Sequence, residues 1–341
     1  MVFSIDDIRA PYISALDAEM RQVVEELAPK EAEFDVLLRF PMGWVDEHGT
    51  DYPYPTGKRL RPLILLLICE GIGGDWRKAL PAAAAVEFLH NFSLIHDDIE
   101  DKSPLRHNRP TVWKIWGTAK AINIGDSLFS VAYKALLRLA QTGISCETHL
   151  RAIEIFTQTV YHISYGQHLD ISFETQEFIS VDDYIEMIGG KTAALIGACA
   201  ELGALIGSEN VDIAQKLALF GFNIGIAFQI HDDILGIWGD QEITGKSASS
   251  DIETRKKSLP VLYGLMHSEA LQAIYRKPEL SADDVQAALN ALDACGAQEY
   301  AREYEQRYIE KAYTAIEDIT LDDIAAKKLN NLIDFLLQRQ Y

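Results

Sequence analysis

Apolar residues recur at helical spacing along nearly the whole chain of 341 residues. Residues three and four positions apart share one face of an α-helix, so this spacing predicts helices that each bury one face. The alternation of period two that is typical of strands is not convincing in any part of the sequence. The expected helices span residues 4–27, 33–40, 60–69, 80–98, 126–140, 147–169, 181–206, 211–237, 259–267, 282–294, 298–318 and 322–339.

The segments between these helices carry turn residues. Ser4 with Asp7 three positions later is typical of a capping box that opens the first helix, which Pro11 either kinks or starts. Residues 41–57 lack an apolar period and indicate a loop, and further turns are expected at 73–75, 207–208 and 239–245. Because no linker rich in Ser, Pro or Gly divides the chain, we expect one all-helical domain over residues 1–341.

One pentapeptide, Ile-His-Asp-Asp-Ile, occurs at residues 95–99 and again at 230–234, each time at the end of an apolar helical segment. In the first copy, Asp97 and Asp101 are four residues apart, so they share a helix face with Asp98 beside them. Like charges at this spacing repel, and a bound cation would relieve the repulsion. Basic residues follow at once, so a cation site adjoins an anion site, which is how Mg²⁺ is usually held with a polyanion.

The repetition makes this interpretation more specific than either copy alone. A single acidic helix end is most often only a solvated helix end. Two such ends that face each other across the cavity of a helix bundle would hold one polyanion through shared metal ions.

Composition narrows the class of protein. The formal net charge of −20 argues against nucleic-acid binding and against electrostatic attachment to anionic membranes. The four cysteines are scattered without a zinc spacing, which favours reduced side chains in a cytoplasmic protein. Asp6 and Asp7 interrupt the N-terminus, so we expect no signal peptide, and no apolar run suggests a stable membrane anchor.

With both motifs in place, the sequence resembles the trans-isoprenyl diphosphate synthases of short-chain type, which make farnesyl or geranylgeranyl diphosphate. The resemblance covers about residues 57–260. It implies an all-α bundle of roughly ten or more helices around a central cavity. It further implies a homodimer that uses Mg²⁺, three ions per active site, to join isopentenyl diphosphate to dimethylallyl, geranyl or farnesyl diphosphate. The implied products are all-trans chains of fifteen to twenty carbons.

The resemblance also assigns roles to individual residues. Asp97, Asp101 and Asp232 hold metal, while Asp98 and Lys191 take part in catalysis. The diphosphate of isopentenyl diphosphate is bound by Lys58, Arg61 and His90, and that of the allylic substrate by Arg106 and Lys191. Thr192 and Gln229 lie near the developing carbocation, and Lys246 and Lys256 close over the diphosphate. Without the resemblance, each of these residues has a common structural explanation, such as a basic turn, a core histidine or an exposed lysine.

Three positions depart from the family's pattern. Thr56 stands where a second glycine is usual, and His107 replaces the second of two adjacent arginines. His107, when protonated, or Arg109 is then expected to take the role of that arginine. Gly236 replaces the third aspartate of the second motif, so metal binding there is expected to rest on Asp232, with Asp233 or a water molecule in support.

The length of the product is expected to depend on the residues below Asp97 on its helix. Phe92 lies about 7.5 Å down the helix axis, with Leu89 roughly one further turn below. Such a ring resembles the one that limits the chain in short-chain members; the alternative is that Phe92 is plain core. Similarly, residues 111–126 continue the family's pattern, but aromatic packing and a helix cap at Asp126 explain them without a role in the chemistry.

Other functions remain open. A synthase of longer chains would keep the same motifs. A terpene cyclase or a head-to-head synthase would also ionise a prenyl diphosphate, but it has little use for the second anion site of Lys58, Arg61 and His90. A non-catalytic partner subunit would keep the fold and typically lose aspartates, whereas here only position 236 departs from the two motifs.

Overall fold

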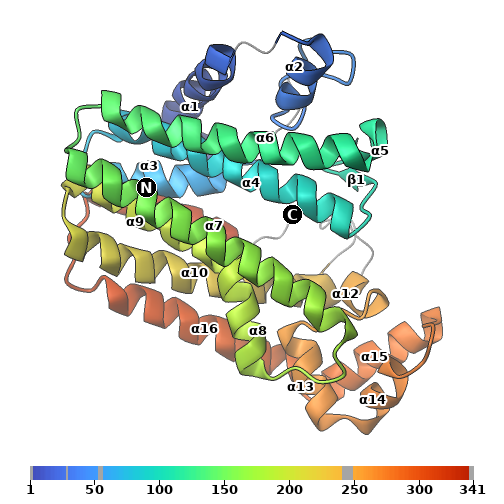
Figure 1. Ribbon diagram of the computed structural model, residues 1–341. Helices are drawn as coiled ribbons and strands as arrows, with labels where there is room; N and C mark the ends of the chain where they lie inside the picture. Colours follow the sequence, from blue (N-terminus) through green and yellow to red (C-terminus); the bar gives the residue numbers. More distant parts are fainter. Residues whose placement is uncertain (1–2, 28–29, 53–56, 240–248, 338–341) are drawn as a thin grey trace. The chain divides into compact units, whose positions relative to one another are not determined.

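The computed structural model describes residues 3–27, 30–52, 57–239 and 249–337, and this part of the chain is almost entirely helical (Figure 1). The α-helices of the first half are α1 (Ile5–Leu27), α2 (Ala32–Arg39), α3 (Leu60–Gly71), α4 (Leu80–Glu100), α5 (Val112–Trp116), α6 (Thr118–Leu137) and α7 (Cys146–Thr175). Those of the second half are α8 (Val181–Ile188), α9 (Ala194–Ser208), α10 (Val211–Trp238), α12 (Ser250–Glu253), α13 (Leu259–His267), α14 (Glu269–Tyr275), α15 (Ala282–Ala294), α16 (Ala297–Ala315) and α17 (Asp323–Leu337). Two 3₁₀ turns, η1 (Trp76–Ala79) and η2 (Arg138–Gln141), lead into α4 and follow α6.

The all-helical prediction is confirmed, and most predicted helices begin and end near the observed bounds. The capping box of α1 is present: the backbone N of Asp7 donates to Ser4 Oγ at 3.1 Å, and Ser4 N donates to Asp7 Oδ2 at 3.1 Å. Pro11 lies inside α1 and does not mark its start. The short helices α5, α12 and α14 were not predicted, because a few residues are too short to show a period.

Two predicted boundaries were wrong. Asp126 was expected to cap a helix but lies within α6, which begins at Thr118. Gly117, which precedes the first residue of α6, has φ of 84°. Glycine adopts this conformation without strain, so the chain turns there. The turn expected at 207–208 comes later as well, because α9 runs through Ser208 and the next residue, Glu209, has φ of 50°.

The predicted helix at 181–206 is interrupted by a π-helical segment, η3 (Gly189–Ala193), between α8 and α9. A side chain on Gly190 would lie 2.7 Å from the carbonyl oxygen of His162, and one on Gly166 would lie 2.1 Å from the backbone N of Lys191. The backbones of α7 and η3 therefore approach as closely as two glycines permit. Single π turns inside helices often mark functional sites.

A small hairpin follows α4. Its strands β1 (Leu105–Arg106) and β2 (Arg109–Pro110) pair antiparallel, with Arg106 opposite Arg109. The two residues between them, His107 and Asn108, have φ of 50° and 59°. A two-residue turn with both φ values positive is the type I′ turn that matches the twist of a hairpin. Strands this short give no alternating pattern, so the sequence did not predict them.

The chain divides into two compact units, and each is described by itself. Unit 1 comprises Met1–Phe156, Cys199–Ala214 and Thr320–Leu332; unit 2 comprises Thr157–Ala198, Gln215–Ile319 and Ile333–Tyr341. The first aspartate motif belongs to unit 1 and the second to unit 2. The expectation of a single domain over residues 1–341 stays a prediction.

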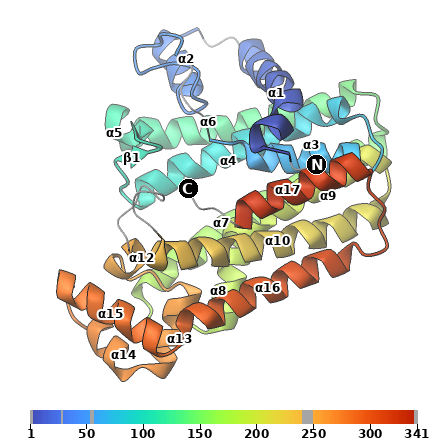
Figure 2. The ribbon, with the colours of Figure 1, turned by 180° about the vertical axis from the view of Figure 1, so that it is seen from behind.

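In unit 1, α4 runs beside α6, and both views of the ribbon show the pair (Figures 1 and 2). The alanines from Ala82 to Ala85 are fully buried, and such small side chains let neighbouring helices come close to α4. Two buried arginines join α1 to the rest of unit 1. Arg138 donates to Glu19 at 2.7 Å, and Arg59, 5% exposed, pairs with Asp17.

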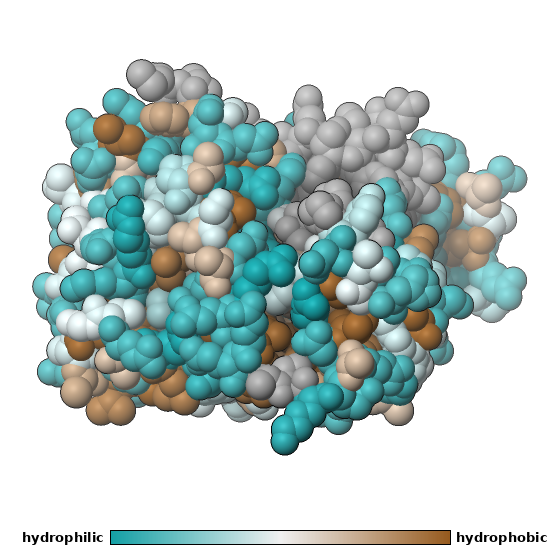
Figure 3. All heavy atoms as spheres, turned by 90° about the horizontal axis from the view of Figure 1, so that it is seen from above, coloured by the Kyte–Doolittle hydropathy of each residue, from teal (hydrophilic) through white to brown (hydrophobic). Residues whose placement is uncertain are grey.

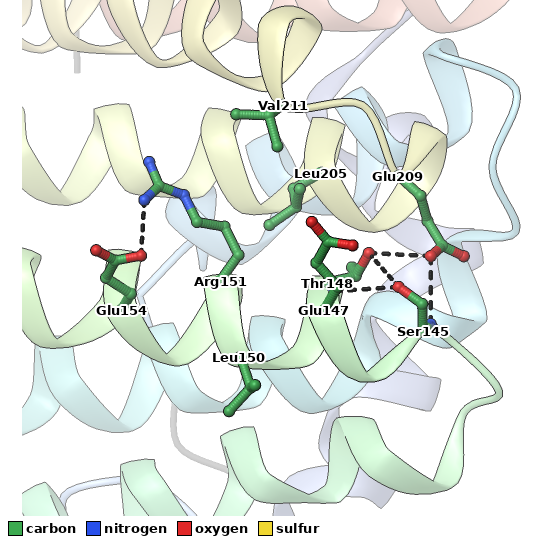
Figure 4. A pocket seen from close by; sticks show the side chains of 9 residues that line it. All are labelled: Ser145, Glu147, Thr148, Leu150, Arg151, Glu154, Leu205, Glu209 and Val211. Atoms are coloured by element: carbon green, nitrogen blue, oxygen red, sulfur yellow. Dashed lines mark hydrogen bonds and ion pairs between the residues drawn. The ribbon is translucent and has the colours of Figure 1, made fainter.

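A pocket of about 670 Å³ opens at the start of α7 (Figure 4). The Glu209 carboxylate there accepts hydrogen bonds from Ser145 N at 3.2 Å and Thr148 Oγ1 at 2.9 Å, so the turn after α9 fastens the N-terminus of α7. None of the nine residues that line this pocket belongs to the motifs singled out in the sequence.

On the face drawn in Figure 3, hydrophilic side chains predominate among the described residues, and apolar ones are scattered between them. Two helical stretches, Val181–Ser208 and Val211–Trp238, are long and apolar enough to cross a membrane by length and composition alone. In their most apolar windows, 83% and 50% of the residues are buried inside the structure. Core helices of a globular protein have the same composition, so these stretches are weak evidence for a membrane protein.

Candidate active site

The first motif lies at the C-terminal end of α4. The helix ends at Glu100, and the backbone N of Asp101 closes the last turn on Asp97 O at 2.9 Å. Asp98 is 5% exposed, Asp97 is half-buried and Asp101 is exposed. The three carboxylates at the end of the helix therefore differ in their exposure to solvent, because neighbouring residues of a helical turn point in different directions.

The hairpin after α4 returns a cation to the motif. Arg106 Nε donates to Asp98 Oδ1 at 2.9 Å, and its Nη2 lies at the same distance from that oxygen. Burial raises the pKa of the Asp98 carboxyl to about 6; the Arg106 guanidinium opposes this shift and Asp101 adds to it. The type I′ turn between β1 and β2 is what points Arg106 back toward α4, so the predicted anion-binding arginine sits beside the predicted metal-binding aspartates.

A second group of basic side chains forms around the start of α3. Arg61 Nη1 and His90 Nε2 lie 3.1 Å apart, which joins α3 to α4. Burial lowers the pKa of His90 well below its usual value, and the nearby charges of Arg61, Arg106 and His107 lower it further. A side chain on Gly57 would lie 3.8 Å from His107 Nε2, so the hairpin turn reaches the loop that precedes α3. The structure thus brings together Arg61, His90 and His107.

The three cations at the start of α3 have separate places. Arg59 has φ of 50° and points into unit 1, where it pairs with Asp17. Lys58 is exposed and Arg61 is half-buried. Arg109, the alternative to His107, instead donates to the Val45 carbonyl at 3.3 Å.

Glu87 is a residue that sequence reasoning missed. It lies one turn before His90 on α4, is 8% exposed, and accepts a hydrogen bond from Asn91 Nδ2 at 3.2 Å. Burial raises the pKa of its carboxyl, and the charges of Arg59 and Arg61 oppose that shift. A glutamate in an otherwise apolar helix face was the signal in the sequence, since such residues are seldom buried unless paired.

In unit 2, the π segment η3 holds two predicted residues. Lys191 forms an ion pair with Asp170 of α7, a partner that the sequence did not assign. Thr192 Oγ1 donates to Gln229 Oε1 at 2.8 Å, so the two residues expected near a carbocation are in direct contact. Gln229 Nε2 in turn donates to Asp233 Oδ1 at 3.1 Å, which links η3 to the second motif on α10.

The second motif is centred on a fully buried carboxylate. Asp233 accepts hydrogen bonds from Tyr184 Oη at 2.6 Å and from Lys256 Nζ at 2.9 Å, in addition to Gln229. Its exposed fraction is 0%, whereas the neighbouring Asp232 is half-buried. Asp233 therefore has three donors from the protein, and Asp232 as the metal ligand of the pair stays a prediction.

Lys256, expected to close over a diphosphate, lies among carboxylates. Its Nζ is 2.9 Å from Asp233 and 3.7 Å from Asp251. Burial acts to lower the pKa of Lys256, but Asp233, Asp251 and Asp232 outweigh it and raise the pKa above its usual value. The lysine is therefore charged.

The two histidines of the repeated pentapeptide bind neighbouring helices. His96 Nε2 lies 3.5 Å from Ile122 O and 3.8 Å from Asp126 of α6. His231 Nδ1 lies 3.0 Å from Glu305 of α16. Both side chains therefore join their helices to neighbouring ones.

Comparison with known proteins decides the family. The model of the polyprenyl synthetases matches residues 43–292, well over half of the chain. The chain belongs to the polyprenyl synthetase family.

Two curated relatives show how broad the similarity is. The (2E,6E)-farnesyl diphosphate synthase of Mycobacterium tuberculosis (strain ATCC 25618 / H37Rv) is 35% identical over 94% of this chain and 89% of its own length. The geranylgeranyl diphosphate synthase of Saccharolobus solfataricus is 40% identical over 83% of this chain and 87% of its own. Among solved structures, the geranylgeranyl pyrophosphate synthase of Corynebacterium glutamicum, complexed with isoprenyl diphosphate and magnesium, is 26% identical with a TM-score of 0.83 over 99% of this chain and 100% of its own.

A row of aromatic rings runs from α4 of this polyprenyl synthetase across α6 to α7. The Phe92 ring lies 4.7 Å from the His96 ring and 5.4 Å from the Phe129 ring of α6. Tyr133 and Phe156 continue this row of rings, at spacings of 5.3 Å and 5.2 Å. Leu89 is fully buried, whereas Phe92 is half-buried. The aromatic packing expected after the hairpin is also confirmed, because Trp116 meets Phe40 edge-on at 5.0 Å.

The donor set of this polyprenyl synthetase suits Mg²⁺. Asp97, Asp101 and Asp232 supply only carboxylate oxygens, the ligand type that Mg²⁺ prefers. Among the residues that the structure describes, no three His, Cys, Asp or Glu side chains form a ready-made metal site. Mg²⁺ does not require one, since it keeps several waters and takes phosphate oxygens as ligands. The predicted Lys246, with Thr56 and Asp240, lies outside the described residues.

Proposed function

We propose that the protein condenses isopentenyl diphosphate with an allylic diphosphate, with Mg²⁺ as cofactor, to give all-trans products of fifteen to twenty carbons. The observation that carries this proposal is the presence of two neighbouring anion sites in unit 1. Arg106 lies at the aspartates of α4, while Arg61, His90 and His107 lie together at the start of α3. A reaction that joins two diphosphates needs both sites, whereas a cyclase needs only the first.

The first step is ionisation of the allylic substrate, in which the C–O bond breaks and the diphosphate leaves with the bonding electrons. Asp97 and Asp101 of unit 1 and Asp232 of unit 2 would hold Mg²⁺, three ions per active site, and the bound ions would stabilise the charge that develops on the leaving group. Arg106 and Lys191 are fixed cations for the same diphosphate. They pair with Asp98 and Asp170, and these ion pairs orient the two cationic side chains.

The second step joins the two substrates. The double bond of isopentenyl diphosphate attacks the allylic carbon, and the resulting cation loses a proton to the released diphosphate. The contact between Thr192 and Gln229 leaves the Gln229 amide group fixed on one side by Thr192 and on the other by Asp233. Oxygens held in this way can face a carbocation without attacking it, because they are not free to form a new bond.

Phe92 is proposed to set the length of the product. Its ring is braced by His96 and Phe129, so a growing chain cannot easily push it aside. Substitution by alanine removes this floor, and we expect Phe92→Ala to yield products longer than those of the wild type. Chromatography of the extracted prenyl alcohols measures the change; an unaltered product distribution would show that another residue limits the chain.

We further propose that the enzyme is a cytoplasmic homodimer. Leu150, Tyr161 and Ile171 of α7 are 68%, 62% and 44% exposed, and exposed apolar side chains are candidates for a contact with a second copy of the chain. Sedimentation equilibrium of the purified protein tests this assignment. A mass of one chain at micromolar concentration would contradict it.

The assignment of the two anion sites is tested by a pair of matched variants, Arg61→Ala and Arg106→Ala. Loss of a charged hydrogen bond weakens binding by about 10- to 100-fold, so Arg61→Ala is expected to raise the KM for isopentenyl diphosphate by that factor. The KM for the allylic substrate should change little. Arg106→Ala is expected to show the opposite selectivity.

Steady-state kinetics with each substrate varied in turn provides the measurement. Equal weakening of both substrates by Arg61→Ala would contradict the proposal of two separate sites. Turnover of geranyl or farnesyl diphosphate that does not depend on isopentenyl diphosphate would favour a cyclase instead.

A further inference from the structure

The hairpin after α4 is fastened to a segment near the start of the chain. Arg109 Nη2 of β2 donates to the Val45 carbonyl at 3.3 Å, and the guanidinium lies 4.2 Å from the centre of the Phe40 ring. The face of an aromatic ring attracts a cation, most strongly where water is excluded, and Phe40 is buried. Strand β2 is therefore held by a second segment of unit 1 in addition to its partner strand.

The segment that receives Arg109 is itself fixed. Val45 is fully buried and forms an antiparallel bridge with Asp51. The backbone N of Tyr52 donates to Trp44 O at 3.2 Å, and the guanidinium of Arg21 of α1 lies 4.6 Å from the centre of the Trp44 ring. Arg109 thus joins the hairpin to a part of unit 1 that is buried, hydrogen-bonded and held by α1.

The turn of the hairpin needs such support. His107 and Asn108 both have positive φ, and residues other than glycine keep this conformation at a cost that the surrounding structure must offset. One strand is held by Arg106, which pairs with Asp98 of α4, and the other by Arg109. The turn is therefore anchored on both sides, and the direction of the His107 side chain is set by the two anchors.

His107 lies beside basic groups from three elements. A Cβ atom on Gly57 would lie 3.8 Å from His107 Nε2, so the imidazole adjoins the loop that carries Lys58. Burial lowers the pKa of His107, and the charge of Arg106 on β1 lowers it further. His107 is in turn among the charges that lower the pKa of His90 on α4. These neighbours favour the neutral form of His107 in the free protein.

A bound diphosphate would reverse this preference. The usual pKa of a histidine is about 6.5, so a lowered pKa leaves His107 mostly neutral near neutral pH. Negative charge beside an imidazole favours its protonated form. A ligand that binds the protonated form more tightly raises the pKa, and its binding therefore takes up a proton.

We propose that Arg109 is a positioning residue of the isopentenyl diphosphate site: it holds the hairpin to residues 40–45 and so keeps His107 beside the diphosphate, which the imidazole binds as a cation only when protonated. An arginine in this position would be charged at every pH at which the protein is folded. The affinity for isopentenyl diphosphate therefore depends on pH. This inference rests on the proposed function, because it assumes that Arg61, His90 and His107 bind this substrate.

Isothermal titration calorimetry of the full-length protein with isopentenyl diphosphate, in the absence of an allylic substrate, measures binding without turnover. Because one proton is linked to binding, the affinity of the wild type is expected to fall by up to about tenfold per pH unit between about pH 6 and pH 8. Titrations in buffers that differ in their enthalpy of ionisation give the number of protons taken up.

His107→Arg is the reference for this measurement, because isopentenyl diphosphate itself also titrates. The permanent charge of the arginine should make binding tighter than that of the wild type at about pH 8. Proton uptake near neutral pH should be lower than in the wild type by about one proton. The substrate's own titration is the same in both proteins, so the difference belongs to position 107.

Variants at position 109 test the positioning role. Arg109→Met is expected to weaken binding at neutral pH by about tenfold and to reduce the proton uptake, because His107 no longer keeps its place. Arg109→Lys, which retains a cation over the Phe40 ring, should recover most of the loss. Lys114→Met is the matched control: Lys114 is an exposed cation 5.9 Å from the centre of the Trp113 ring, in the helix after the hairpin, and its loss should leave binding unchanged.

Thermal unfolding shows whether each variant is folded. If Arg109→Met is not, Arg109→Gln, which keeps a hydrogen-bond donor but not the charge, takes its place with the same expectation. Equal proton uptake by the wild type and His107→Arg overturns the proposal, as does wild-type affinity in the folded variant without a cation at position 109.

The same titrations separate this inference from the proposed function. If the wild type does not bind isopentenyl diphosphate, the second anion site of the proposed function fails together with this inference. If the wild type binds and only the variants depart from expectation, the proposed function stands and this inference alone fails.

Discussion

The two copies of Ile-His-Asp-Asp-Ile place their aspartates in the same way. In each copy the second aspartate is buried and pairs with a cation from a later segment: Asp98 with Arg106, and Asp233 with Lys256. The first aspartate of each copy is half-buried. Successive residues on a helix point about 100° apart, so one of two adjacent carboxylates turns inward and the other outward. The pentapeptide therefore encodes one buried carboxylate that pairs with a cation and one half-buried carboxylate, which is the one predicted to bind metal.

The copies differ at their third acidic position. At the end of α4 this position is Asp101, which is exposed. In α10 the corresponding position is Gly236, where a side chain would meet the Asp251 carboxylate at 2.6 Å. Asp233 is also more deeply embedded than Asp98, since Tyr184 and Gln229 bind it in addition to its lysine. The first motif thus depends little on its surroundings, whereas the second requires several segments of unit 2 to be in place.

The largest effect on activity is expected for the half-buried aspartates, Asp97 and Asp232. Asp97→Asn and Asp232→Asn should each lower kcat by at least about a thousandfold, because the charge on the leaving diphosphate loses its stabilisation. The melting temperatures should stay close to that of the wild type, since neither side chain is fully buried. Incorporation of labelled isopentenyl diphosphate and thermal unfolding provide the two measurements. If one variant keeps most of its activity, the two copies do not play equivalent parts.

Substitution of the buried aspartates, Asp98 and Asp233, should lower the stability of the protein by different amounts. Asp233→Ala leaves the Lys256 charge and the Tyr184 hydroxyl without their partner, which should lower the free energy of unfolding by about 3 kcal/mol. Asp98→Ala should cost less than about 1 kcal/mol, because the Arg106 side chain is 34% exposed and can turn to water. Urea unfolding of both variants measures the difference. Equal losses would mean that burial does not distinguish the two copies.

A further effect is a pH dependence of stability at the first copy. The pKa of Asp98 is raised to about 6 by burial, so the folded state holds the proton more tightly than the unfolded state does. The contribution of Asp98 to stability is therefore present in full below about pH 4 and is lost as the pH rises to about 6. Asp98→Asn removes this contribution. Urea unfolding of metal-free protein between pH 4 and pH 8 gives the free energy of unfolding of wild type and variant. The difference between the two should change within that pH window, and a constant difference would contradict the prediction.

Much of the fold follows from the sequence because long amphipathic helices leave a clear period. The bounds of α10 and α13 were predicted within one residue, and the family resemblance over 57–260 is confirmed by the match over 43–292. At the site, the contacts between Arg61 and His90 and between Thr192 and Gln229 join residues that the sequence had assigned to shared roles. Asp97, Asp101 and Asp232 stay predictions as metal ligands.

What could not be predicted depends on contacts between segments that are distant in the chain. The π segment arises where Gly166 and Gly190 let two backbones touch, and periodicity along one segment carries no trace of that approach. The partner of Lys191 is Asp170, twenty-one positions away, and nothing local in either segment pairs them. The Asp251 carboxylate lies against Gly236, and neither segment alone indicates this contact. In each case the sequence shows the residue but not its neighbour.

The most direct test of the proposed function is a product assay with the purified protein, Mg²⁺ and labelled isopentenyl diphosphate. Dimethylallyl, geranyl and farnesyl diphosphate serve in turn as the starter. The account predicts labelled all-trans products that end at fifteen or twenty carbons and that disappear when Mg²⁺ is removed by a chelator. Consumption of the starter without incorporation of label, or no reaction with any starter, would contradict it.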